Sequence, residues 1–400
     1  MKKIFFILII LLIPFISVPA SDWGLLLNQN AGIIANGKEA DNSQYSAALV
    51  PWFDISKAWG KIFISLGPVL SVENKEPSFA PDIYRTELMF NIKQNSMLKI
   101  GRMPYSDPLG YVAQGLFDGA QFAHNIKGGT LGFGIWYTGV LYNKSARITI
   151  TDDDYVSYAG ILDYKNFIAT YFASRRLVFA ADWDNKDISD WITFRLAFIG
   201  QFDLNGQPKY YHSQYLAVKA SVPINKFIFD LGFCPELAET PDGTKFAAAW
   251  EMGLGFIPPT PFKDWINLTG RFTSGAIDKD SDVAQFQPIT TLEQGDVLKA
   301  KLSGLSMIRL NYIVRSLPSL SLNFASSYFV LSDKASYMGL PAGRNGHFLG
   351  NEFSAKVLWV PLSDLRLSFV AGVFLPSLGN ADPKGKSLWR FDLTATIIIF

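Results

Sequence analysis

Long stretches of the chain alternate between apolar and polar residues, and this pattern limits the possible folds more than any other feature. Such an alternation places successive side chains on opposite faces of a β-strand. It recurs in the segments 84–93, 298–315, 365–375 and 389–399. In the segment 190–204, one face would carry Ile192, Phe194, Leu196, Phe198, Phe202 and Leu204, and the other Thr193, Arg195, Gln201 and Asp203.

These alternating runs are longer than the strands of most soluble proteins, which have about 5 to 6 residues. A tilted strand that crosses a membrane needs about 9 to 11 residues. Beyond the N-terminal region the sequence has no run of ~18 apolar residues, so it predicts no transmembrane helix. The pattern therefore predicts an all-β protein, a transmembrane antiparallel up-and-down β-barrel.

The N-terminus has the three parts of a secretory signal peptide. Lys2 and Lys3 precede an apolar run, and Val18-Pro19-Ala20 provides small residues for cleavage. We therefore expect residues 1–20 to be a signal peptide and residues 21–400 to form the barrel. An exported barrel is expected to lie in the outer membrane of a diderm bacterium, where membrane lipids surround it.

The connections between the predicted strands alternate between short and long. Short turns such as Gln94-Asn95-Ser96 contrast with long loops such as 277–296 and 332–350. Outer-membrane barrels have this asymmetry, and they also carry aromatic girdles. Most tryptophans lie near predicted strand ends, as a girdle requires.

The pattern yields nineteen candidate strands, whereas bacterial single-chain barrels have even numbers. The extra candidate lies between Tyr142 and Glu236, so one segment in this region is misassigned as a strand. We expect the segment 182–189 to be a loop. We therefore predict 18 strands, with 16 as the alternative. The candidates in this region are 154–164, 167–181, 190–204, 211–222 and 225–236.

The chain ends with the apolar and aromatic segment Arg390 to Phe400, RFDLTATIIIF. This segment is expected to be the last strand and to close the barrel. It resembles the C-terminal strand of outer-membrane proteins, which implies recognition by the barrel-insertion machinery. Phe400 shares the parity of Thr394 and Thr396 rather than that of the apolar residues, so we expect a bulge or an interfacial strand end there.

If the apolar face contacts lipid, basic side chains dominate the inward face. Rings of arginine and lysine favour anions in a pore, although the alternative is ordinary lumen solvation with compensating acidic loops. A barrel of this size leaves an aqueous lumen. The pore-lining candidates are Arg85, Arg195, Lys219, Arg271, Lys299, Lys301, Arg309, Arg315, Arg366 and Arg390.

The segment Leu98 to Phe122, LKIGRMPYSDPLGYVAQGLFDGAQF, has a Gly-Arg strand end, a long loop and a Gly-Leu-Phe-Asp-Gly strand start. It resembles a recurring segment of substrate-specific outer-membrane porins, particularly the alginate-export type. The resemblance implies an 18-stranded barrel with an arginine-lined anionic pathway. It would add Arg102 to the pore-lining set, although Arg102 shares the parity of Leu98 and Ile100.

Other site chemistry is weakly indicated. Asp278, Asp280 and Asp282 imitate a calcium loop, but the expected glycine and glutamate are Val283 and Ile289. His124, His212 and His347 stand in no catalytic motif, and the single Cys234 cannot form an intramolecular disulfide. We therefore predict no enzyme, no metal site and no cofactor.

The charge balance is close to neutral. Of 36 Lys and Arg residues, Lys2 and Lys3 belong to the leader, which leaves 34 against 35 acidic residues. Nothing in this balance indicates nucleic acid as a partner.

The sequence as a whole favours a porin that passes small hydrophilic solutes, with anions preferred if the basic lumen prevails. Two alternatives stay open. One is a closed surface protein, such as an adhesin or receptor. The other is a hydrophobic-substrate transporter, although the segment 22–40 is too short for a large plug. The sequence leaves the oligomeric state open.

Overall fold

The computed structural model describes residues 21–399, except 38, 74–75, 190, 207–209 and 277–281. The predicted signal peptide and Phe400 lie outside the described residues. The register of Phe400 and its recognition by the insertion machinery therefore stay predictions.

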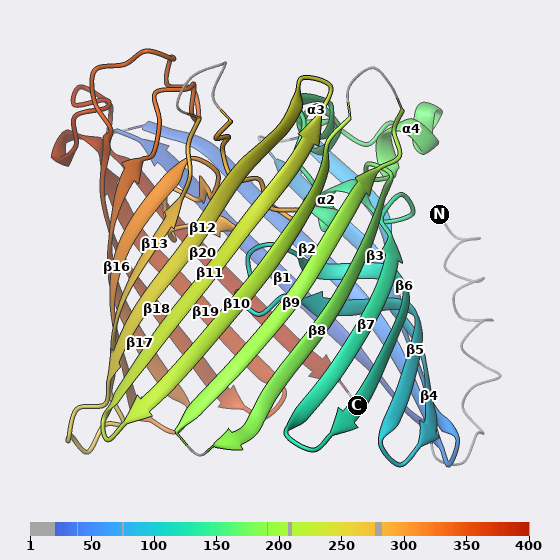
Figure 1. The fold of residues 1–400 in the computed structure, drawn as a ribbon. Coiled ribbons are helices and arrows are strands. Elements are labelled where there is room, and N and C mark those ends of the chain that lie inside the picture. The colour runs from blue at the N-terminus through green and yellow to red at the C-terminus, as the bar shows by residue number, and fades with distance from the viewer. Residues whose placement is uncertain are drawn as a thin grey trace.

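The chain forms a closed antiparallel barrel of 18 strands, as predicted (Figure 1). Strands that follow one another in the chain are neighbours, and β1 pairs with β20 to close the barrel. The barrel strands are β1 (Ser21–Asn36), β2 (Glu39–Lys57), β3 (Gly60–Glu73), β4 (Glu76–Lys93), β5 (Ser96–Ser106), β6 (Gln114–Ile126), β7 (Gly129–Tyr137), β8 (Arg176–Ser189), β9 (Ile192–Asp203), β10 (His212–Ile224), β11 (Phe227–Thr240), β12 (Gly243–Phe256), β13 (Trp265–Thr273), β16 (Leu305–Leu317), β17 (Leu320–Leu331), β18 (Phe348–Leu362), β19 (Leu365–Leu375) and β20 (Leu388–Ile399).

The remaining elements belong to the loops. A two-stranded ribbon, β14 (Glu293–Gln294) and β15 (Ala300–Lys301), lies between β13 and β16. The helices are α2 (Asn143–Ala146), α3 (Asp152–Ala159), η2 (Tyr164–Asn166), α4 (Phe167–Tyr171) and η3 (Pro376–Leu378). None of the described helices is long and apolar enough to cross a membrane.

The misassigned strand is the segment 154–164. It contains most of α3, because Thr151 and Asp154 form a reciprocal capping box that starts a helix. The predicted strand 167–181 was also wrong at its start, since α4 occupies 167–171 and β8 begins at Arg176. β8 then continues through 182–189, where the sequence suggests a loop. Removing one strand leaves the eighteen that the sequence predicts.

The predicted strand 297–315 was also too long. β16 begins only at Leu305, and residues 297–304 belong to a loop. Lys299 has a φ of 49°, and Gly304 has a φ of 65°. These left-handed conformations do not fit a continuous strand, so the alternation of residues 298–303 does not reflect the barrel wall.

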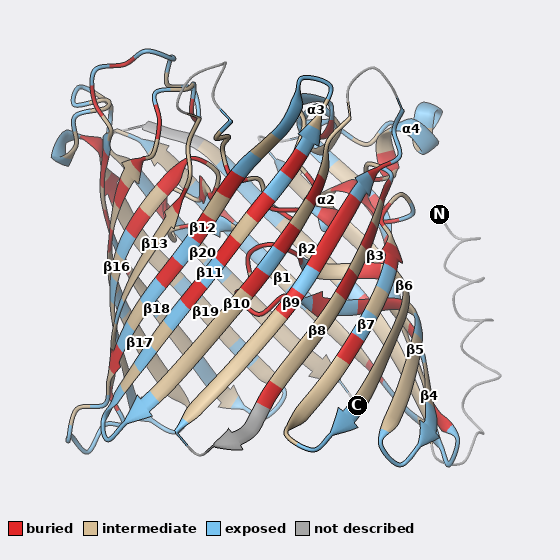
Figure 2. Cartoon of the chain, in the orientation of Figure 1, coloured by how far each residue is buried: buried red, intermediate tan, exposed pale blue. Residues whose placement is uncertain are grey.

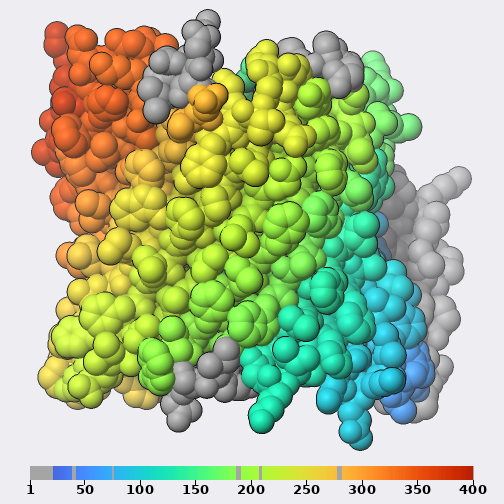
Figure 3. Space-filling view, in the orientation of Figure 1, coloured from blue at the N-terminus to red at the C-terminus, as the bar shows by residue number. Residues whose placement is uncertain are grey.

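The two faces of the barrel wall differ as the alternation predicts. On β20, the outward residues Trp389, Phe391 and Leu393 are 41–49% exposed, whereas the inward Arg390 is 7% exposed. Exposed and buried residues alternate along many strands (Figure 2). The outer sides of neighbouring strands form a continuous surface (Figure 3). An apolar outer band of this kind is what a membrane-spanning barrel requires.

The two ends of the barrel differ in the length of their connections. β1 starts and β20 ends at the same end, where the turns are short. The other end carries the long connections 138–175, 274–304 and 332–347. Figure 1 shows these loops at the upper end, opposite the C-terminus. The first two also contribute residues to the lumen, as described next.

Candidate functional site

The hairpin β5–β6 leaves the barrel wall and enters the lumen. β5 pairs with β4 only as far as Arg102, and β6 pairs with β7 only from Asp118. The hairpin itself continues to the pair Ser106 and Gln114. In Figure 1 this part crosses the interior of the barrel. The segment Leu98 to Phe122, which carries the resemblance to substrate-specific porins, is therefore the element that narrows the lumen.

Asp107 fixes the turn at the tip of this hairpin. Its Oδ1 accepts hydrogen bonds from the N–H groups of Leu109 and Gly110 at 2.8 and 3.0 Å. Its Oδ2 accepts from Val112 and Ala113, both at 2.9 Å. Burial raises the pKa of this carboxyl, although the four backbone N–H groups act in the opposite direction. One side chain thus holds the whole tip in shape.

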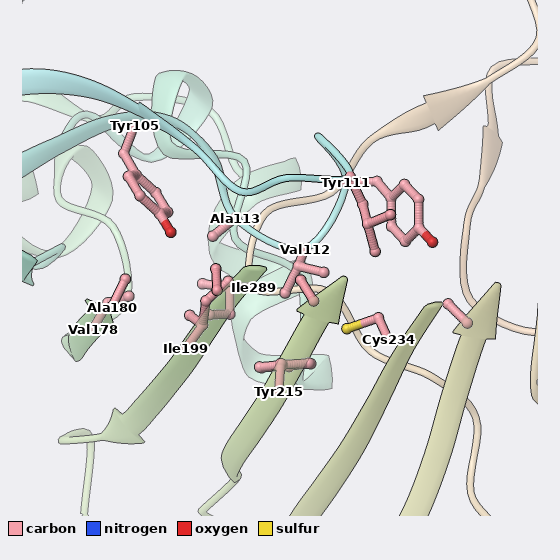
Figure 4. Packing of buried hydrophobic residues seen from close by; sticks show 14 of the residues in the cluster. Tyr105, Tyr111, Val112, Ala113, Val178, Ala180, Ile199, Tyr215, Cys234 and Ile289 are labelled. Carbon is pink, nitrogen blue, oxygen red and sulfur yellow. The ribbon is translucent and has the colours of Figure 1, made fainter. Parts of the chain in front are cut away.

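The tip packs against the inner wall through apolar contacts. Tyr105 stacks near Trp136, with ring centroids 4.6 Å apart. Val112 faces the wall residues Tyr215 and Cys234, both of which are almost fully buried (Figure 4). Burial of such side chains stabilises a contact by about 1.5–3 kcal/mol each. The hairpin is therefore a fixed part of the lumen and not a free loop.

The connection 274–304 forms a second structure inside the barrel and contacts the hairpin. The N–H of Ile289 donates to the carbonyl oxygen of Val112 at 2.7 Å. The N–H of Gln114 donates to Oγ1 of Thr290 at 2.8 Å. Figure 4 shows Ile289 beside the hairpin tip and the wall strands. Hairpin and loop together form one constriction.

Buried carboxylates attach this loop to distant strands of the wall. Glu236 on β11 accepts hydrogen bonds from the Gln287 N–H at 2.8 Å and from the Tyr211 hydroxyl at 2.6 Å. Glu352 on β18 accepts from three successive N–H groups at 2.6 to 3.0 Å, those of residues 296–298. The loop therefore spans the lumen between β11 and β18.

Asp296 adds an ion pair to this attachment. Its carboxylate lies 2.5 Å from Nη2 of Arg309 and accepts a hydrogen bond from the Ser354 hydroxyl at 2.7 Å. Burial alone would raise the pKa of Asp296, but Arg309 and Ser354 outweigh burial and lower the pKa below its usual value. Asp296 therefore stays ionised under ordinary conditions.

Three lumen carboxylates each pair with two cations. Among these cations, Arg85, Lys219 and Lys299 have side chains 29–35% exposed, and the other three are 9–20% exposed. The groups of Glu87 and Glu251 each retain one positive charge that the carboxylate does not neutralise, whereas Lys299 of the third group also lies 3.9 Å from Glu293. The groups are Glu87 with Arg85 and Lys99, Glu251 with Lys219 and Arg271, and Asp392 with Lys299 and Arg390.

The other predicted lining residues have different surroundings. Nε of Arg195 lies 3.4 Å from Oδ2 of Asp184. Lys301 is in the lumen loop, with its Nζ 4.2 Å from the ring centre of Tyr155. Arg315 and Arg366 are exposed near short turns, and neither forms an ion pair within the described part of the chain.

Arg102 occupies the point where the hairpin leaves the wall. Its guanidinium pairs with Asp118 across the hairpin at 2.8 Å and donates to the carbonyl oxygens of Ile83 and Val140. Only 4% of the residue is exposed. Arg102 therefore connects three segments of the chain, and its contacts indicate a structural role.

Two cavities are lined in part by residues of the hairpin or of the loop 274–304. One of about 1080 Å³ is lined by residues of the long loops, including Thr151, Tyr158, Lys299 and Tyr337. Another of about 350 Å³ is lined by Lys99, Tyr105, Gln121 and Arg195, among others. Both linings combine hydroxyl groups with basic and acidic side chains, which suits hydrophilic solutes.

Sequence reasoning missed the residues that hold the constriction. Asp107, Glu236 and Glu352 are buried acids on or beside alternating segments, and their partners lie far away in the chain. The only local indication was the Asp-Pro-Leu-Gly sequence at 107–110, which favours a turn. The remaining residues could not be assigned, because no sequence pattern reveals which backbone groups enter the lumen.

The candidate metal and histidine sites gain no support. Asp278 and Asp280 lie outside the described residues. Within the described residues no group of His, Cys, Asp or Glu could hold a metal ion. His124 accepts from or donates to Ser96 at 2.8 Å, and Cys234 is buried.

No family model and no curated protein matches this sequence. Several solved structures of Pseudomonas aeruginosa outer-membrane channels are similar in fold. OccK2 (OpdF) in complex with glucuronate has a TM-score of 0.64 at 12% identity, over 95% of this chain and 98% of that chain. OprD has a TM-score of 0.59 at 14% identity, over 96% and 94% of the two chains.

OccK11 (OpdR) gives a TM-score of 0.59 at 14% identity, over 95% of this chain and 96% of that chain. At these identities the likeness establishes the fold. It confirms the predicted 18-stranded barrel fold. Together with the apolar outer band, this fold places the chain in a bacterial outer membrane.

Proposed function

We propose that this protein is an outer-membrane channel for small hydrophilic solutes and that it prefers anions. The observation that supports this proposal is the arrangement around Glu87 and Glu251, where each lumen carboxylate has two cations. The more exposed cation of each group is available to a solute. Positive charges in a narrow pore of low dielectric attract anions and repel cations.

The surroundings of the constriction support a selective channel. Hairpin and loop occupy part of the lumen, so a solute passes close to charged side chains. One protein of the same fold was solved with glucuronate, a sugar that carries a carboxylate. We therefore infer that small hydroxylated carboxylates are good candidates for the cargo. An enzymatic role has no support in the geometry described above.

The proposal is tested by single-channel recording of refolded protein under a salt gradient. We expect open steps and a reversal potential that indicates anion preference. The triple change of Arg85, Lys219 and Lys299 to Gln should move the reversal potential toward cation preference, because it removes one positive charge from each group. The control is Arg315→Gln with Arg366→Gln, which changes exposed residues near the short turns.

Two outcomes would contradict parts of this proposal. A folded protein without open steps would favour the closed surface protein. Open steps without a shift in the triple variant would remove the role assigned to the cations. Liposome swelling with glucuronate and with neutral glucose then tests the cargo, and equal rates would argue against carboxylate preference.

A further inference from the structure

The barrel wall has an interruption beside β4. β4 pairs with β3 from Glu76 to Phe90, with a register shift between Ile83 and Arg85. On its other side, β4 pairs with β5 only from Thr86 onward. The edge formed by 76–85 therefore has no partner among the described strands. An open strand edge does not persist in lipid, because its polar groups would be unsatisfied.

Side chains bind three carbonyl groups of this edge in place of a strand. The Tyr164 hydroxyl donates to the carbonyl oxygen of Phe79. The Tyr171 hydroxyl donates to the carbonyl oxygen of Pro81 at 2.7 Å, and Arg102 donates to that of Ile83 at 2.7 Å. Residues 79, 81 and 83 alternate along the strand, so their carbonyl groups point to the same side.

The segment 138–175 also packs against the inner side of β4. Tyr171 stacks on Tyr142, with ring centroids 4.8 Å apart, and both belong to a buried cluster with Ala80. Ser145 on α2 donates to the carboxylate of Asp82 at 2.5 Å. The segment therefore fills the place that β5 and β6 leave when they enter the lumen.

The interruption lies within the apolar outer band. The outward residues of β4 are apolar on both sides of Thr86, and Phe79 and Ile83 are 50% and 42% exposed beside the uncovered edge. The guanidinium of Arg102 joins Ile83 to Val140, which is 44% exposed. The apolar surface of β4 is thus continuous with the segment 138–175.

The segment itself exposes large apolar side chains. Ile161 is 67% exposed, Tyr164 is 57% exposed and Ile168 is 77% exposed. Figure 2 shows α4 as an exposed element at the upper right rim. In Figure 3 the light-green atoms of this region lie directly above the atoms of the neighbouring strands. Water is an unfavourable surrounding for so large an apolar surface.

We propose that the segment 138–175 replaces strands in the membrane-facing wall and that Ile161, Tyr164 and Ile168 contact acyl chains of the outer leaflet. Lipid is the occupant that fits, because these residues continue the lipid-facing band of β4. The hydrogen bonds to three carbonyl groups lower the cost of placing this edge in a medium that offers no hydrogen bonds. This interaction surface is independent of any solute that passes through the lumen.

The test uses nitroxide labels in proteoliposomes. Ile161→Cys and Ile168→Cys are each labelled, and collision with oxygen is compared with collision with a water-soluble nickel chelate. Phe133→Cys on the outward face of β7 is the lipid control, and Ser336→Cys in the larger cavity is the aqueous control. Cys234 is buried, so the folded wild-type protein should remain unlabelled.

We expect the labels at 161 and 168 to behave like the label at 133, with frequent oxygen and rare chelate collisions. Chelate collisions as frequent as at 336 would overturn the proposal. Labelling does not require transport, so a failed channel assay leaves this result unaffected. Resistance of the folded band to unfolding in detergent confirms that each variant has the barrel.

Discussion

Asp107 shows how a single side chain holds the tip of the inward hairpin in shape. Its two carboxylate oxygens accept four backbone hydrogen bonds at the tip of the inward hairpin. An unsatisfied buried N–H group costs about 1–3 kcal/mol. The shape of the tip therefore depends on an acceptor at both oxygen positions, which only a carboxylate supplies.

We predict that Asp107→Asn widens the constriction while the barrel stays folded. The amide nitrogen would face two N–H groups that need an acceptor, so the tip should open. Single-channel conductance should increase, and it is measured beside Asp364→Asn, a change at an exposed residue near a short turn. Equal conductance in both variants would show that the tip does not limit the current.

At the scale of the element, the segment 138–175 illustrates competition between local and long-range structure. Its apolar residues suggest a strand, but the capping box of Thr151 and Asp154 starts a helix. Asp154 also pairs with Arg176, which fixes the end of the segment at the start of β8. The segment then supplies tyrosine hydroxyl groups to the uncovered edge of β4.

We predict that Tyr164→Phe with Tyr171→Phe lowers the thermal unfolding midpoint. Each change keeps the aromatic ring but leaves a carbonyl group of β4 unsatisfied, at a cost of about 1–3 kcal/mol. The midpoint is followed by gel mobility of the folded band on heating. Tyr45→Phe, at an exposed outward position on β2, is the control and should leave the midpoint unchanged.

If the double variant and the control melt at the same temperature, the two hydroxyl groups do not stabilise the wall. The proposal of a lipid-facing segment would then rest on the exposed apolar residues alone. The label experiment would still decide it.

At the scale of the whole molecule, the barrel and its contents have different roles. The eighteen strands provide a membrane-compatible wall, and the hairpin and the loop 274–304 reduce the open lumen. The loop is attached to β11 by Glu236 and to β18 by Glu352, so it depends on a closed barrel. The width of the lumen should therefore depend on the contents, whereas most of the paired cations lie on the strands of the wall.

We predict that replacing 275–303 with a short Gly-Ser linker raises the conductance, because the replacement removes the obstruction. The replaced segment has five acidic residues and three lysines, so its removal should not weaken anion preference. Conductance and reversal potential are measured on the same protein. An unchanged conductance would mean that the solute path avoids this loop.

The sequence by itself determined the wall. Alternation over more than nine residues requires one apolar face and one polar face, and only a closed barrel satisfies both in a membrane. The pattern narrowed the strand number to 18 or 16, because bacterial single-chain barrels have even counts, and the structure has 18. The direction of Arg195, Lys219 and Arg390 followed from the same alternation.

Only the tertiary structure decided what fills the wall. The inward path of β5 and β6, the surroundings of Arg102 and the attachment by Asp107, Glu236 and Glu352 depend on contacts between distant residues. The alternation of residues predicts which face of a strand is apolar, but it does not predict where a strand stops pairing with the next strand. The end of the pairing depends on which backbone groups find hydrogen-bond partners once the barrel is closed.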